Sequence, residues 1–137
     1  MAQVSVRWLE KLQFVGTDSS KHSVVLSSQD DENGVGMKPS ELMLVALGGC
    51  SAYDVVNILT KKRKKLTGLE VSVSAEQLPD PPWTFVKIHM SYRLRGRDLT
   101  EKAVQDAIKL SKDKYCSVGA TLSTRAEITY DYVIEEE

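Results

Sequence analysis

The longest apolar stretch of the chain limits its fold more than any other feature. After Pro39, apolar residues dominate from Ser40 to about Leu59, and they cover most of the circumference of a helix. Proline is well tolerated in the first turn of a helix. The cations at residues 61–65 suit the negative end of a helix dipole. A helix that is apolar all round must be buried, so we expect this one at the centre of the fold.

The length of the chain decides how such a helix can be covered. With 137 residues, the chain can form one domain with a hydrophobic core but not two, so we predict a single domain over residues 1–137. A domain of this size has difficulty burying the helix alone, which predicts a homodimer that shares it. Gly48-Gly49 in its middle costs roughly 1 kcal/mol per glycine relative to alanine. These glycines indicate that another backbone or a substrate comes close there.

Segments with alternating apolar residues flank the predicted helix on both sides. Such period-two alternation is typical of strands with one buried face, and it places Trp8 and Tyr92 inward. A second helix has a capping-box-like start at Asp98 and Glu101. The predicted strands cover residues 3–10, 12–15, 23–28, 69–75, 86–94 and 126–134. The order βββ-α-ββ-α-β predicts an α+β fold with antiparallel sheets around the buried central helix.

The charge balance and the N-terminus exclude several classes of protein. Lys and Arg number 18 against 19 Asp and Glu, so the chain lacks the positive charge of a general nucleic-acid binder. Residues 61–65 are therefore interpreted as a solvated helix end. The first residues alternate and carry charge, whereas a signal peptide needs a continuous apolar segment. The chain has no stretch of about 18 or more consecutive apolar residues, so no membrane span is expected. We expect a cytoplasmic protein with neither nucleic acid nor membrane as a partner.

Two cysteines, Cys50 and Cys116, are the candidate reactive residues. Two are too few for a disulfide scaffold, and a free cysteine is commonly packed as a small hydrophobe. Their spacing is not that of a metal site, because the chain has no Cys-x-x-Cys pair and only His22 and His89 could assist. Neither a metal nor another cofactor is predicted. The cysteines are thus either a reactive pair or simply packed.

The residues around both cysteines favour a reactive pair. The segment 39–50 (PSELMLVALGGC) closely resembles the first cysteine motif of the OsmC/Ohr family of thiol-dependent peroxidases. The segment 114–118 (KYCSV) resembles the second cysteine motif, and the element order also agrees with the family. The continuation 50–56 (CSAYDVV) is similar to a small bacterial OsmC-like branch typified by YhfA. The resemblance covers essentially the whole chain.

This resemblance implies a fold, a mechanism and a pocket. Cys50 as thiolate would attack a hydroperoxide and become a sulfenic acid, and Cys116 would condense with it to a disulfide. An external dithiol of the lipoyl type would then reduce that disulfide. Two such cysteines must bring their Cα atoms within about 7 Å. An apolar substrate pocket formed by Leu47, Gly48, Gly49 and Tyr53 would suit an organic hydroperoxide.

The chain departs from the peroxidases that it resembles in the residues that activate the thiol. In those peroxidases an N-terminal arginine, held by a glutamate near the first helix, lowers the thiol pKa. This chain has no arginine over residues 8–62, which leaves Arg7, Lys21 and Lys38 as candidate cations. Ser40 aligns with the glutamate position, and Glu41 is its neighbour. The alternative is therefore an OsmC-fold protein with weak or no peroxidase activity that binds an apolar small molecule.

Overall fold

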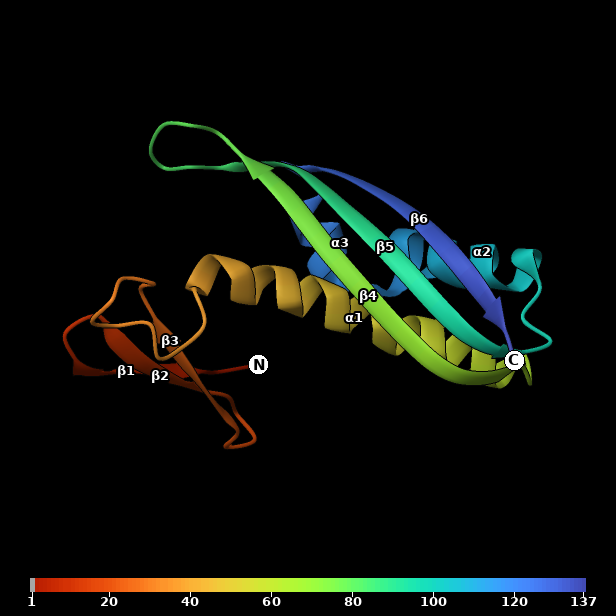
Figure 1. The fold of residues 1–137 in the computed structure, drawn as a ribbon, viewed down its shortest axis with the longest axis horizontal. Helices are drawn as coiled ribbons and strands as arrows, with labels where there is room; N and C mark the ends of the chain where they lie inside the picture. The colour runs from red at the N-terminus through yellow and green to blue at the C-terminus, as the bar shows by residue number, and fades with distance from the viewer. Residues whose placement is uncertain (1) are drawn as a thin grey trace. The chain divides into compact units, whose positions relative to one another are not determined.

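The computed structural model describes residues 2–137, which fall into two compact units (Figure 1). The first unit extends to Met43 and the second begins at Leu44. Helix α1 (Pro39–Lys61) contributes its first turn to the first unit and its remainder to the second. Each unit has its own three-stranded sheet. The assignment of the whole chain to one domain stays a prediction.

The first unit contains the three short strands expected before the helix. They are β1 (Ser5–Glu10), β2 (Gln13–Thr17) and β3 (Ser23–Ser27), and they form an antiparallel sheet in that order. The prediction that Trp8 points inward is wrong for this unit, because Trp8 is 65% exposed and its indole Nε1 donates to the carbonyl of Lys11 at 2.8 Å. A single three-stranded sheet has too few residues in its own unit to cover both faces.

The second unit is built on strands β4 (Lys65–Gln77), β5 (Phe85–Arg97) and β6 (Glu127–Glu136). Strands β4 and β5 pair antiparallel, as predicted, but β6 pairs parallel to β5. The expectation of wholly antiparallel sheets is therefore corrected here. Parallel pairing needs a crossover connection, and the helices between β5 and β6 return the chain to the end where β5 begins (Figure 1).

The predicted second helix is divided into three pieces. Helix α2 (Glu101–Leu110) continues into a π-helical turn, η1 (Ser111–Tyr115), and α3 (Ser117–Leu122) follows. The N-cap of α2 is Thr100, whose Oγ1 accepts from the amide of Ala103 at 3.1 Å, not the predicted Asp98. An N-cap residue has extended backbone, whereas Asp98 has a φ of 60°.

The core of the second unit lies between one face of its sheet and the helices (Figure 1). Alternate side chains of β5 are buried, as the alternation predicted, and Tyr92 is among them. The fully buried large side chains from these elements are Leu47, Val55, Leu59, Ile88, Leu94, Val104 and Ile108. Burial of a leucine or isoleucine side chain contributes about 1.5–3 kcal/mol, so this cluster stabilises the position of α1 on the sheet.

Helix α1 is buried along one face in the described chain, not all round as predicted. Leu47, Val55 and Leu59 face the core, whereas Val45 and Tyr53 are exposed. Residues 39–61 are also long and apolar enough to cross a membrane, with a mean hydropathy of 1.7 over the best window. The core helix of a soluble protein meets the same criteria, so length and hydropathy alone do not identify α1 as a membrane span.

Candidate active site

The second unit brings both cysteines together with a carboxylate. Cys50 and Asp54 are four residues apart on α1 and therefore lie on the same face of the helix. Cys116 is far from both in the sequence and directly follows η1. The two sulfur atoms and a carboxylate oxygen of Asp54 all lie within 4.8 Å of one another. Both cysteines are free thiols, so the arrangement is that of a reduced pair.

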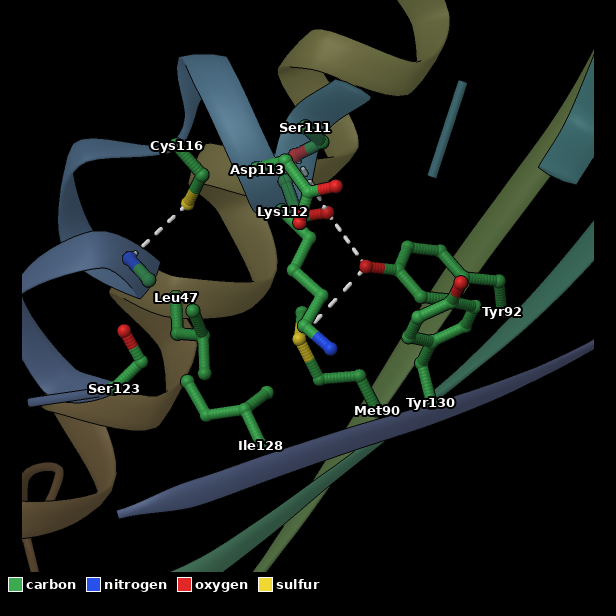
Figure 2. Close-up of a pocket in the computed structure, with 12 residues that line it drawn as sticks. Leu47, Met90, Tyr92, Ser111, Lys112, Asp113, Cys116, Ser123, Ile128 and Tyr130 are labelled. Carbon is green, nitrogen blue, oxygen red and sulfur yellow. Dashed lines mark hydrogen bonds between the residues drawn. The ribbon is translucent and has the colours of Figure 1, made fainter. Parts of the chain in front are cut away.

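The π-helical turn positions Cys116. The amide of Cys116 donates to the carbonyl of Ser111 at 2.8 Å, which closes the wide turn. The Sγ of Cys116 then accepts from the amide of Gly119 at 3.3 Å and caps the start of α3 (Figure 2). A Cβ at position 119 would lie 3.3 Å from this sulfur and 3.5 Å from Cδ1 of Leu47. The glycine therefore leaves the space in which the sulfur sits.

A chain of buried hydroxyl groups connects the sheet to Asp54. The hydroxyl of Tyr92 lies 2.6 Å from Oγ of Ser51, and Ser51 is 3.1 Å from Oγ of Ser111. Ser111 in turn donates to Oδ2 of Asp54 at 2.8 Å. Hydrogen bonds to a carboxylate are stronger than those between neutral groups. This network therefore orients the Asp54 carboxylate beside the thiols.

Burial controls the protonation of this cluster. It raises the pKa of the Cys116 thiol to about 11, and the neighbouring Cys50 and Asp54 add to the increase. Burial also raises the pKa of Tyr92, although its hydrogen bond with Ser51 opposes the shift. At neutral pH Cys116 is a thiol and Tyr92 a phenol. Cys116 is only 4% exposed, whereas Cys50 is half-buried, so the two sulfur atoms are not equivalent.

A cavity of about 160 Å³ adjoins Cys116 (Figure 2). Its walls are mainly apolar, and Lys112 borders it with Nζ 5.4 Å from the ring centroid of Tyr130. The other side chains drawn around the cavity include Leu47, Met90, Tyr92 and Ile128. The cavity is large enough for a small apolar group, and Lys112 supplies a cation at its border.

The predicted substrate pocket does not form one surface in this unit. Leu47 borders the cavity beside Cys116, but Gly48 packs against β4, where an added Cβ would lie 3.2 Å from Cγ2 of Val73. Gly49 and Tyr53 border a separate, open hollow. The reason is the helical period, because consecutive residues of a helix point in directions about 100° apart. The element that comes close to Gly48 is therefore strand β4 and not a substrate.

The residues expected to activate the thiol belong to the first unit. Arg7 lies exposed on β1, and Lys21 is exposed in the turn between β2 and β3. Ser40 and Glu41 lie in the first turn of α1. Their role in thiol activation stays a prediction.

Four residues of the site were missed by the sequence analysis. Asp54 could have been found, because a carboxylate four residues after a candidate nucleophile shares its helix face. Ser51, Ser111 and Tyr92 had no comparable signal. Ser111 reaches Asp54 through the π-helical turn, and Tyr92 reaches Ser51 across the core. Those contacts depend on how separate elements pack.

Comparison with known proteins agrees with this architecture. The family model described as OsmC-like protein matches residues 29–131. Protein YhfA of Escherichia coli K12 is 37% identical over 132 residues, covering 96% of this chain and 97% of that protein. The chain therefore belongs to the OsmC-like family. Membership, together with two neighbouring thiols, is compatible with a redox role.

Solved structures show the same fold at lower sequence identity. An OsmC-like protein from Mycoplasma pneumoniae superposes with a TM-score of 0.85 at 13% identity, covering 98% of this chain and 96% of that one. The organic hydroperoxide resistance protein OhrB of Bacillus subtilis gives a TM-score of 0.65 at 12% identity, covering 97% and 98%. At such identities the similarity establishes the fold alone.

Proposed function

We propose that this protein is a thiol-dependent hydroperoxide reductase in which Cys50 is the peroxidatic cysteine and Cys116 the resolving one. The observation that carries the proposal is the distance between the sulfur atoms, which lie within 4.8 Å although the residues are far apart in the sequence. A reactive pair needs this proximity, whereas two cysteines that serve only as packing do not. The difference in burial supports the assignment, because the less buried Cys50 is the more accessible to a peroxide.

In the first step the thiolate of Cys50 attacks the distal oxygen of the hydroperoxide. The O–O bond breaks, the sulfur becomes a sulfenic acid, and the alkoxide leaves and takes up a proton to give an alcohol. The peroxide is reduced by two electrons and the sulfur is oxidised by two. An organic hydroperoxide fits the apolar surroundings of the thiols better than hydrogen peroxide does.

In the second step Cys116 attacks the sulfenic sulfur of Cys50. The S–S bond forms, the hydroxyl group leaves, and the proton of the Cys116 thiol completes a water molecule. The Asp54 carboxylate lies within 4.8 Å of both sulfur atoms, where it can accept that proton and deliver it to the leaving hydroxyl. An external dithiol of the lipoyl type then reduces the disulfide and is itself oxidised to a disulfide.

The working form of the protein in this proposal is a cytoplasmic homodimer. The exposed face of α1 supports it, because Tyr53 is 73% exposed and Val45 and Val56 are also exposed. Apolar residues gathered on one surface mark interaction sites more often than random surface does. A second copy that covers this face would complete the burial that the sequence of the helix predicts.

A second candidate function is the binding of an apolar small molecule without peroxide chemistry. The cavity beside Cys116 favours it, because the walls are mainly apolar and Lys112 lies at the border. In that case Cys50 and Cys116 would be packed side chains that take no part in the function. The two functions are separated by the fate of the thiols on exposure to peroxide.

The decisive experiment counts thiols after reaction with tert-butyl hydroperoxide. The reduced, metal-free protein is treated with a stoichiometric amount, and free thiols and gel mobility are measured. We expect two thiols per chain to be lost without cross-linking between chains. Cys116→Ser should stop at a sulfenic acid that dimedone traps, and Cys50→Ser should leave Cys116 unreacted. Equal peroxide consumption by wild type and Cys50→Ser, with dihydrolipoamide as reductant, would remove Cys50 from the mechanism.

A further inference from the structure

The cluster of Cys50, Asp54 and Cys116 has the composition and spacing of a metal site, although the sequence spacing predicted none. Zinc binds thiolate sulfur at about 2.3 Å and carboxylate oxygen at about 2.0–2.2 Å, so ligand atoms around a tetrahedral ion lie about 3.6–3.8 Å apart. The three candidate ligand atoms lie within 4.8 Å of one another. We infer that the reduced protein binds one zinc-type divalent cation through the two sulfur atoms and the Asp54 carboxylate.

The chemistry of the ligands selects the cation. Two thiolates are soft ligands that favour zinc and similar transition metals, whereas magnesium and calcium require oxygen ligands throughout. Three protein ligands leave a fourth position of a tetrahedral ion open. A water or another small ligand would complete the coordination at that position.

The hydroxyl network supplies the outer support that such a site needs. Metal-binding carboxylates are themselves hydrogen-bonded, which fixes their orientation. Ser111 donates to Oδ2 of Asp54 at 2.8 Å and is itself buried. Ser111 also contacts Ser51, which contacts Tyr92. The carboxylate is thus held at the cluster by a buried network that begins in the sheet.

Metal binding and oxidation would compete for the same sulfur atoms. A disulfide between Cys50 and Cys116 has no thiolate to offer a metal, and a bound cation withdraws electron density from the Cys50 thiolate that would attack a peroxide. The cation would therefore protect the reduced pair, and oxidation would release it. This protection rests on the proposed function, whereas metal binding itself does not.

The test is an anaerobic titration of the reduced, metal-free, full-length protein with Co²⁺. Cobalt bound to thiolate absorbs in the near ultraviolet, and tetrahedral cobalt absorbs strongly in the visible range. We expect both bands to saturate at one ion per chain and to disappear when Zn²⁺ is added. Protein oxidised with diamide to the Cys50–Cys116 disulfide should show neither band. Absence of a thiolate band in the reduced wild type overturns the inference.

Variants separate the three-ligand site from binding by the thiols alone. Asp54→Asn keeps the shape of the side chain and should weaken Co²⁺ binding by more than about tenfold, and Ser111→Ala by about tenfold. Asp80→Asn, an exposed carboxylate in the loop between β4 and β5, is the matched control and should bind like wild type. Unchanged affinity in Asp54→Asn overturns the inference.

Ser111→Ala keeps the test decisive if Asp54→Asn fails to fold, because unchanged affinity in that variant also contradicts the proposed site. Circular dichroism checks the folding of each variant. The thiol counts of the peroxidase experiment use metal-free protein, so either proposal can fail without the other.

Discussion

The two faces of helix α1 differ in chemistry although they share one stretch of apolar sequence. One face carries Leu47, Val55 and Leu59 into the core and holds Cys50 and Asp54 against Cys116. The opposite face exposes apolar side chains, Tyr53 most of all. Hydrophobicity alone does not distinguish these faces. The reactive face is the one that a strand and a second helical segment cover, because burial and neighbours decide what a side chain can do.

The largest expected effect on stability comes from the buried face. Leu59→Ala should lower the free energy of unfolding by about 2–5 kcal/mol, because Leu59 is fully buried and its removal leaves a cavity. Tyr53→Ala on the exposed face should change the stability of the isolated chain by less than about 0.5 kcal/mol. Urea unfolding of both variants in dilute, monomeric protein measures the difference. A cost of Tyr53→Ala that grows with protein concentration would show that a second copy covers this face, as the proposed homodimer requires.

The next prediction concerns pH and the Cys116 thiol. Burial raises its pKa from the ordinary value of 9.0 to about 11. An acid whose pKa is raised by folding stabilises the fold below its unfolded pKa, and this contribution is lost as pH rises. The stability advantage of wild type over Cys116→Ser should therefore decline between pH 9 and 11.

Urea midpoints of both proteins across that interval provide the measurement. Comparison with Cys116→Ser removes the contributions of lysine and tyrosine titration, which the two proteins share. A constant difference between them would contradict a raised pKa of Cys116 in the folded state.

A smaller effect is expected from the hydroxyl network. Tyr92→Phe removes the hydroxyl that lies 2.6 Å from Oγ of Ser51, while Ser51 keeps its contact with Ser111. The loss should be about 1 kcal/mol of unfolding free energy, the net contribution of a typical hydrogen bond. Tyr132→Phe, at an exposed hydrogen bond with Gln105, is the matched control and should cost less. Equal costs would argue that the buried network adds no stability.

The smallest and sharpest comparison uses two adjacent glycines. Gly49→Ala should stabilise the protein by about 0.5–1 kcal/mol, because a Cβ there meets nothing within 4 Å and alanine is the better helix former. Gly48→Ala should gain less or lose stability, since its Cβ would lie 3.2 Å from Cγ2 of Val73. Thermal unfolding of both variants decides the order. The reverse order in monomeric protein would mean that β4 does not restrict α1 at Gly48.

The positions of most elements could be predicted from local patterns. Alternation identified all three strands of the second unit, and the length and ends of α1 followed from Pro39 and the lysine-rich segment after it. Both cysteines could be selected from the motifs around them. Strand period, helix capping and chain breakers act over a few residues. The elements that they define can therefore be recognised from neighbouring residues in the sequence.

Tertiary structure alone decided the composition of the site. The parallel course of β6 depends on the crossover of the helices, and the π-helical turn sets Ser111 beside Asp54. The same packing separates Gly49 and Tyr53 from the cavity that Leu47 borders. The sequence by itself determined which positions carry a thiol or a charged group and which segments form helices or strands. Which of them meet, and how strongly burial shifts their pKa, was set by contacts between segments far apart in the chain.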